Sequence, residues 1–386
     1  MLSWRQSSWA LRYIRSSSIA ARKALNIRIV QCRRPGDLIN LLRKETTTDA
    51  GLAHLNNVNL CTSFHRLAKL GVPSWTDVPS DIRSALVGRL QEQELEPLHL
   101  ANLLWAFSLM QKTVFSSDGV EERLFESLLR LIEENVSHIE QPQLLSNIVW
   151  SLARLGRNPS SLLERLSDHL LHLLNKADLQ AQPAANPTAG FDIQELSNTI
   201  WALSKLDAGS PELFDAMARA VPAVFAKDPK TITAQALGNI CYGFANSKHS
   251  SENANKFVFR SVANYIEPLL PSFSEQALCN IAWALGKTNI SVPKLLGHIT
   301  LTLESRPIES VSHHIVVLWA LSRTGFFREP FFLLCVKRFP ERLHEFKDKE
   351  LDSCLRSFKT AGVHAPKLIG AIMQEADRRK ITLTNV

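Results

Sequence analysis

The sequence predicts an all-α protein, an α-solenoid of about eight helical-hairpin repeats of roughly 40 residues. Three observations support this fold class. A short pattern recurs along the chain, as SNIVWSLARLG at 146–156, SNTIWALSKLD at 197–207 and CNIAWALGKTN at 279–289. Its apolar residues have helical spacing, and a second amphipathic segment follows each copy. A single hairpin of this kind cannot bury its apolar face, so successive hairpins must stack on one another.

The chain begins with a basic segment. Residues 1–36 contain seven Arg, one Lys and six Ser but neither Asp nor Glu. This composition predicts an organellar transit peptide over residues 1–36, with a basic arm that stays attached as the alternative. The whole chain has a net charge of +7, but outside this segment 36 Lys and Arg face 37 Asp and Glu. The positive charge therefore belongs to the leader and is not evidence for nucleic-acid binding.

The repeat domain is expected over residues 37–380, followed by a short tail at 381–386. Eight copies of the pattern align on central residues, which are His65, Trp105, Trp150, Trp201, Tyr242, Trp283, Trp319 and Arg356. The longest interval between centres contains a stretch rich in Pro and Ala at 180–190, which we expect to be an inserted surface loop. The first and last copies lack the central aromatic residue, as expected for atypical terminal repeats.

Two positions in each copy are apolar and share one helical face. Five residues before the centre, Leu stands in seven of the eight copies, and His314 is the exception. Two residues after the centre, all eight copies have Leu or Phe. We expect this face to be buried. The residue directly after the centre is small in seven copies, which predicts close helix approach, with the central Trp packed between repeats. Base stacking by an exposed ring is the alternative role for Trp.

A polar stripe lies on roughly the opposite face. Three residues before the centre, five copies have Asn: Asn102, Asn147, Asn198, Asn239 and Asn280. Four residues after the centre, five copies have a cation: Lys69, Arg154, Lys205, Lys287 and Arg323. The stripe predicts an RNA-binding surface in which the cations hold phosphates and the Asn side chains face bases. Alternatively, Asn bonds to a neighbouring helix, and the cations form a solvated face near helix C-termini, where positive charge is favoured.

The pattern L-x-N-x-x-W-A/S-L/F-x-K/R-L-G resembles the organellar octotricopeptide and heptatricopeptide repeats and the helical arrays of FAST-kinase-type and RAP proteins. The likeness covers residues 38–380. It implies a protein of the mitochondrial matrix, or less favourably a plastid, that binds single-stranded RNA in processing, stability, editing or translation. Some relatives belong to organellar ribosomes, so a non-catalytic scaffold subunit of a ribosome or RNA-processing complex is the alternative. The last copy leaves too few residues for the C-terminal RAP domain of many relatives.

Motifs that carry catalysis are absent from the sequence, including the phosphate-binding loop, the dinucleotide turn, the HExxH helix and the GxSxG elbow. His169 and His172 share a helical face without a third ligand nearby, and the adjacent His313 and His314 are expected to point in different directions. The six cysteines are widely spaced and predict buried thiols. We therefore expect no enzymatic activity, no cofactor, no metal site and no insertion into a membrane.

Overall fold

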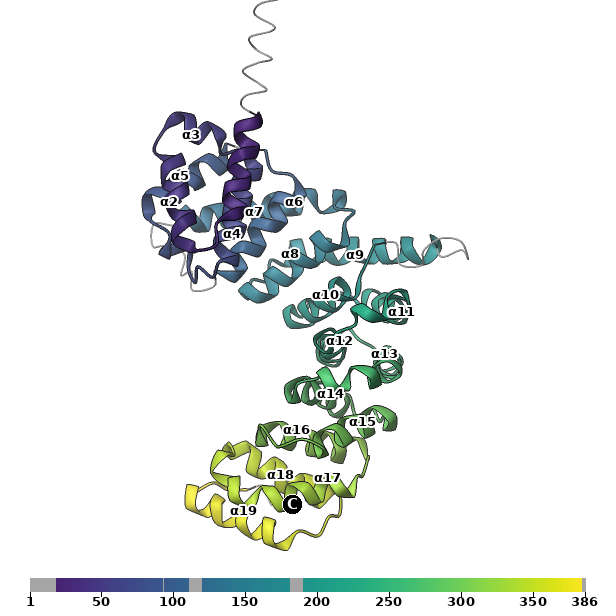
Figure 1. Cartoon of the computed structure of the whole chain (residues 1–386). Helices are drawn as coiled ribbons and strands as arrows, with labels where there is room; N and C mark the ends of the chain where they lie inside the picture. Colours follow the sequence, from purple (N-terminus) through teal and green to yellow (C-terminus); the bar gives the residue numbers. More distant parts are fainter. Residues whose placement is uncertain (1–18, 93, 111–119, 181–189, 384–386) are drawn as a thin grey trace, which may run out of the picture. The chain divides into compact units, whose positions relative to one another are not determined.

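A computed structural model describes residues 19–92, 94–110, 120–180 and 190–383. Over these residues the secondary structure is helical and includes no β-strand, which confirms the all-α prediction. The chain forms two compact units, Met1–His169 and Leu170–Val386, and each is described by itself (Figure 1). None of the helices in the described ranges is long and apolar enough to cross a membrane.

The described residues of the first unit form a helix over residues 19–31 and seven further helices, and the long helix α9 continues from this unit into the second one. These elements are α2 (Pro35–Thr46), α3 (Asp49–His54), α4 (Asn57–Lys69), α5 (Ser80–Gln91), α6 (Pro97–Leu109), α7 (Val120–Asn135), α8 (Pro142–Leu155) and α9 (Ser160–Gln180). Single 3-10 turns lie at Trp75–Asp77 and Val136–His138. Helix α6 packs against α4 on one side and α8 on the other.

After α9, the described residues of the second unit form ten regular helices in alternation. They are α10 (Ile193–Leu206), α11 (Pro211–Lys227), α12 (Ala234–Asn246), α13 (Glu252–Tyr265), α14 (Glu275–Thr288), α15 (Pro293–Glu304), α16 (Val311–Thr324), α17 (Glu329–Arg338), α18 (Asp348–Thr360) and α19 (Pro366–Arg379). Three 3-10 turns follow second helices, at Pro229–Thr231, Glu267–Ser272 and Pro340–Glu345.

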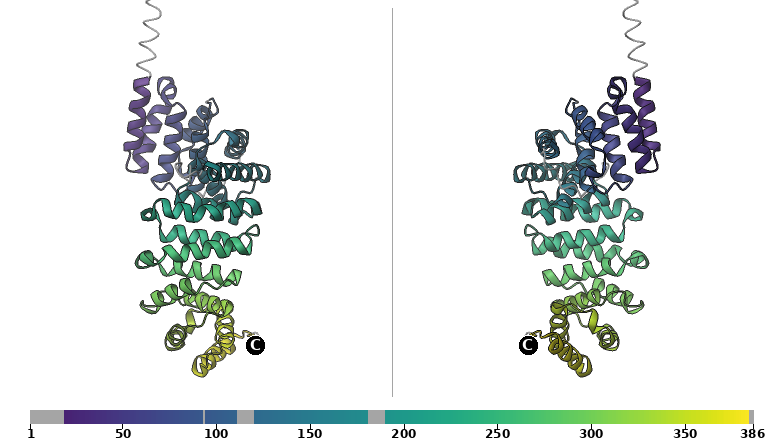
Figure 2. Two further views of the ribbon diagram at one scale, coloured as in Figure 1. Left: turned by 90° about the vertical axis from the view of Figure 1, so that its right-hand side faces the viewer. Right: turned by 90° about the vertical axis from the view of Figure 1, so that its left-hand side faces the viewer.

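Helices that carry the sequence pattern are called first helices here, and those that follow them are called second helices. The first helices are α4, α6 and α8 in the first unit and α10, α12, α14, α16 and α18 in the second unit. In the second unit, consecutive first helices pack on one another, and α11, α13, α15 and α17 form a parallel row behind them. Figure 2 shows the teal and green helices of this unit lying one above another. This consecutive packing is that of an α-solenoid.

The face predicted to be inward is buried in every copy. The Leu five residues before each centre is fully covered, and His314 takes the same place with no exposed surface. The Leu or Phe two residues after the centre is at most 3% exposed, the largest value being that of Phe107. The core of each unit is therefore built from these two positions together with the apolar face of the second helices.

The sixth residue after the centre ends the first helix in most copies. Its backbone has a left-handed conformation at Gly71, Gly156, Asp207, Asn289, Gly325 and Gly362. The left-handed region is open to glycine and is tolerated by Asn and Asp, whose short polar side chains bond locally. The last letter of the repeated pattern is therefore a helix stop, because only these residue types reverse the chain there at low cost.

Arginine side chains at the ends of two second helices bind the preceding 3-10 turn. Arg306 donates to the carbonyl oxygens of Leu270 at 2.9 Å and Phe273 at 2.6 Å. Arg379 donates in the same way to Leu343 at 2.9 Å and Phe346 at 2.6 Å. A guanidinium group can satisfy two carbonyls at once, so each arginine fixes the turn that joins one hairpin to the next.

Residues 19–31, within the expected leader, pack as a helix on the first unit. Leu25 and Ile29 are 2% and 0% exposed. The buried Asn59 donates from Nδ2 to the carbonyl of Arg22 at 3.2 Å. Residues 1–18 lie outside the described ranges, as do residues 181–189 of the expected loop and 384–386 of the tail. Removal of residues 1–36 as a leader stays a prediction.

All six thiols are free, and five of them are buried, the half-buried Cys32 being the exception. Burial raises the pKa of the Cys61 thiol to about 12 and that of Cys279 likewise to about 12. Such thiols stay protonated at neutral pH and serve as small apolar side chains. The prediction of buried thiols is confirmed for these five residues.

Candidate nucleic-acid interface

The ten residues of the predicted polar stripe all lie on first helices. The first unit holds Lys69, Asn102, Asn147 and Arg154, and the second unit holds Asn198, Lys205, Asn239, Asn280, Lys287 and Arg323. All five Asn residues and Arg154 are half-buried, whereas the four other cations are exposed. The second unit therefore contains the longer part of the stripe.

The Asn side chains are largely unused by the protein. Asn280 accepts a hydrogen bond from Gln276 Nε2 at 2.8 Å. Across the described residues, the side chains of Asn102, Asn147, Asn198 and Asn239 have no hydrogen-bond partner in the chain. The alternative in which Asn holds neighbouring helices in register is therefore not observed. These amides keep their donor and acceptor capacity for water or a ligand.

Two of the cations, in contrast, bond to the preceding repeat. Arg154 Nε donates to the carbonyl of Ser108 at 3.0 Å, which joins α8 to α6. Lys287 Nζ donates to Asn246 Oδ1 at 2.8 Å, and Asn246 Nδ2 in turn donates to the carbonyl of Ser204 at 3.2 Å. Burial lowers the pKa of Lys287. These contacts show a structural role that the spacing alone left open.

The central aromatic rings are half-buried, although the sequence predicted rings packed fully between repeats. Their contacts across repeats are observed: His65 stacks on Trp105 at 4.6 Å between centroids, and Tyr242 stacks on Trp283 at 5.1 Å. Each ring is partly accessible, and it lies beside the polar stripe and not on the Leu face. The rings thus combine inter-repeat packing with partial exposure.

Cations lie over several of these rings. Lys205 Nζ is 5.0 Å from the centroid of Trp201, and Lys287 Nζ is 4.9 Å from that of Trp283. The four-residue spacing places each cation one helical turn beyond its ring, at the distance of a cation–π interaction. Ring and cation therefore form one surface feature that repeats from helix to helix.

Glutamine seven residues before the centre is a component of the face that the sequence reasoning missed. It occurs in four consecutive copies, at Gln143, Gln194, Gln235 and Gln276, and is exposed in each. Its signal was present, because each Gln precedes the Asn of the stripe by one helical turn. Each of these helices therefore presents a pair of amides near its N-terminus.

Two hollows lie between these amide pairs in the second unit. A hollow of about 180 Å³ between α10 and α12 is lined by Gln194, Asn198, Gln235 and Asn239. A hollow of about 320 Å³ between α12 and α14 is lined by Gln235, Asn239, Gln276 and Asn280. Each hollow is thus bordered by amides on both sides, with the N-capping Thr233 or Ser274 at its margin.

The two adjacent histidines do not point apart, which corrects the expectation from sequence. Nδ1 of His313 and Nδ1 of His314 both lie 3.2 Å from Glu275 Oε1. His314 is fully buried, and burial lowers its pKa although the Glu275 carboxylate opposes this shift. In the other pair considered, on α9, His169 Nε2 lies 2.9 Å from the carbonyl oxygen of Ile139. Within the described ranges, no group of three or more His, Cys, Asp or Glu could hold a metal ion.

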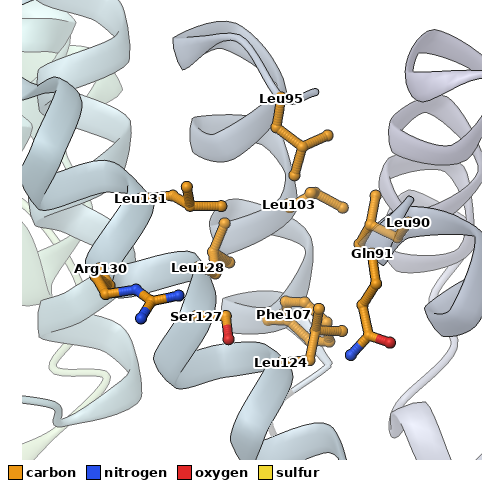
Figure 3. Close-up of a pocket in the computed structure, with 10 residues that line it drawn as sticks. All are labelled: Leu90, Gln91, Leu95, Leu103, Phe107, Leu124, Ser127, Leu128, Arg130 and Leu131. Atoms are coloured by element: carbon orange, nitrogen blue, oxygen red, sulfur yellow. The ribbon is translucent and has the colours of Figure 1, made fainter. Parts of the chain in front are cut away.

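A third hollow, of about 230 Å³, lies in the first unit among α5, α6 and α7 and is mainly apolar. Figure 3 shows its leucines between Gln91 on one side and Arg130 on the other. Half of its ten lining side chains, such as Leu103 and Phe107, belong to the buried core of that unit. It lacks the repeated polar groups of the hollows in the second unit.

Comparison of the chain with protein-family models and with curated proteins gives no match. Function is therefore inferred from the residues and their geometry.

Proposed function

We propose that this is a non-catalytic helical-repeat protein of about eight repeats that binds single-stranded RNA of the mitochondrion through its first helices. It would act in RNA processing, stability, editing or translation. The observation that carries the proposal is the pair of amide-bordered hollows in the second unit, which recur at one repeat spacing. Amides offer donors and acceptors together, as the edges of unpaired bases require.

In this proposal, the cations of the stripe bind phosphates and the central Trp rings contact the faces of bases. The exposed Lys205 and Arg323 carry positive charge toward the C-terminal ends of their helices. Beside the cations, the half-buried Trp rings would offer their accessible part to a base. Arg154 and Lys287 contribute charge from fixed positions, because their side chains are held by the preceding repeat.

Fluorescence anisotropy with an end-labelled oligouridylate tests the amides. The double variant Asn198→Ala/Asn239→Ala is expected to bind at least ten-fold more weakly than the parent, because it removes two amides that have no partner within the described part of the chain. Asn253→Ala removes an exposed amide from the second helix α13 and serves as the matched control. Equal affinity of the double variant and the parent, with both folded, would contradict the proposal.

Salt dependence tests the cations separately. The variant Lys205→Glu/Arg323→Glu is expected to reduce the slope of log affinity against log salt by about 0.7 for each phosphate that is no longer neutralised. Its melting temperature should stay close to that of the parent, since both side chains are exposed. An unchanged slope would show that these cations do not meet phosphates. Arg154 is unsuitable for this test because it also bonds to Ser108.

The alternative function is a scaffold subunit of an organellar ribosome or RNA-processing complex. Large apolar side chains on second helices favour it, because Phe257, Leu301, Leu333 and Met373 are 47–54% exposed. Affinity purification from organelles with and without ribonuclease distinguishes the two functions. Partners retained after ribonuclease treatment support the scaffold, and partners that disappear with the RNA support direct binding to RNA.

A further inference from the structure

The two amide-bordered hollows of the second unit are built from equivalent positions. On one side, each hollow is lined by four residues of a first helix, which stand eight, seven, four and three positions before the centre of that helix, the last of them being the Asn of the polar stripe. The next first helix contributes its own Gln and Asn and the residue six positions before its centre. That last residue is Ala236 in the first hollow and Ala277 in the second. A methyl group at this position leaves the space between the helices open.

At the next junction, between α14 and α16, the equivalent position holds His313. His313 Nε2 lies 2.7 Å from Gln276 Oε1, and Gln276 Nε2 donates to Asn280 Oδ1 at 2.8 Å. The imidazole therefore stands where the two preceding junctions have a methyl group. It also engages the amide pair that α14 presents at this junction, where α16 itself has Ser312 and Val316 in place of Gln and Asn.

Glu275 fixes the imidazole in this place. It stands where the earlier hollows have Ile193 and Ala234, and it is only 4% exposed. Its carboxylate accepts hydrogen bonds from the backbone N–H groups of Glu309 at 2.9 Å and Ser310 at 3.1 Å, which caps α16 from the neighbouring helix. Because these bonds hold the carboxylate still, His313 Nδ1 at 3.2 Å has a rigid partner.

We propose that His313, positioned by Glu275, closes the equivalent space at the α14–α16 junction and ends the row of base-binding hollows in the second unit. This inference rests on the proposed RNA-binding function and adds a limit to it. A strand bound to this unit meets unpartnered amides on both sides of the α10–α12 hollow and on the α12 side of the α12–α14 hollow, within the described residues. It meets an occupied site at the α14–α16 junction, where His313 engages Gln276. His313 thereby determines the length of RNA that the unit contacts.

The affinity of the protein for oligouridylates of increasing length measures how many nucleotides the unit contacts. For the parent, affinity rises with oligonucleotide length and then becomes constant once the open hollows are filled. The His313→Ala variant has in α16 the residue that α12 and α14 have at this position. The affinity of this variant is therefore expected to become constant at an oligonucleotide one nucleotide longer than for the parent. The longest oligonucleotides should also bind about five-fold more tightly, through the added amide contacts.

Ala277→His is the reciprocal variant. It places an imidazole beside Gln235, as His313 stands beside Gln276, and should make the affinity constant one nucleotide earlier. Ala277 is half-buried, so the added ring can be accommodated at the surface. Neither variant changes Glu275, so its capping bonds to the backbone of α16 are preserved, and circular dichroism verifies that both proteins are folded.

The outcomes separate the two ideas. If the parent binds oligouridylates and both folded variants reach constant affinity at the parent's length, the inference about His313 is overturned while RNA binding stands. If the parent and the His313→Ala variant bind no oligonucleotide, the proposed function fails, and the inference fails with it. A shift in opposite directions for the two variants supports the inference.

Discussion

Replacement of Gly243 by Ala tests how closely the first helices approach one another. Gly243 follows the centre of α12, the position predicted to need a small side chain. A Cβ atom placed on Gly243 would lie 2.5 Å from Ile200 Cγ2 and 2.9 Å from the carbonyl oxygen of Ile200 in α10. Side-chain rotation can relieve the first contact only, because the second involves the backbone of the neighbouring helix.

Two opposing terms determine the magnitude. Within a helix, Gly to Ala is favourable by about 1 kcal/mol. Overpacking a well-packed interface costs about 1–3 kcal/mol, with the upper part of that range applying where backbone must move. We therefore expect Gly243→Ala to lower the free energy of unfolding by about 1–2 kcal/mol. The change should weaken the α10–α12 interface, because a repeat contacts only its neighbours.

Gly238 provides a control in the same helix. A Cβ atom placed on it meets nothing within 4 Å, so Gly238→Ala should stabilise the chain by about 1 kcal/mol. Urea unfolding of the full chain, followed by far-ultraviolet circular dichroism, measures both variants. The two substitutions are chemically identical and are expected to act in opposite directions. Equal stabilisation by both would refute the close approach at Gly243.

Three further predictions concern stability. Burial lowers the pKa of His314, so below about pH 6.5 the unfolded chain binds a proton at this residue more readily than the folded chain does. The free energy of unfolding therefore decreases as the pH is lowered below about 6.5. His314→Leu, which restores the Leu of the other copies, should make thermal melting less sensitive to pH between neutral and about 5, and an unchanged sensitivity would assign it to other groups. A chain beginning at residue 37 should melt at a lower temperature than one beginning at residue 19, because it lacks the buried Leu25 and Ile29; equal melting of the two would show that the helix over residues 19–31 adds no stability. Trp201→Ala should cost about 2 kcal/mol, below the 3–5 kcal/mol typical of a fully buried ring, because the ring is half-buried.

The inward face could be predicted residue by residue, and the roles within the polar stripe could not. Leu196 and Leu203 are seven residues apart and lie on one stripe of any helix, so their burial follows from spacing. Asn198 and Lys287 both stand at positions of the stripe that recur in five copies. The side chain of Asn198 has no partner in the described chain, whereas Lys287 bonds to Asn246. The difference depends on the position of a residue about 40 places earlier, which spacing within one helix does not contain.

The histidines on α16 illustrate the same limit. Adjacent residues on a helix differ by about 100° in direction, which favoured separate environments for His313 and His314. Helix α14 lies close enough for one carboxylate, Glu275, to reach both rings. The partner was not evident from sequence because Glu275 stands at a position where the preceding helices have apolar residues.

The sequence alone determined that the described chain is helical, which face of each first helix is buried and where most of these helices end. These properties are local, since the 3.6-residue period and the left-handed residue at the helix end are set within a few positions. Only the tertiary structure decided which polar side chains are held by a neighbouring repeat and which remain available, and that His313, at the position equivalent to Ala236 and Ala277, bonds to Gln276 of the preceding first helix. A hydrogen bond depends on distances of a few tenths of an ångström between separate helices, and the packing of the repeats alone sets those distances.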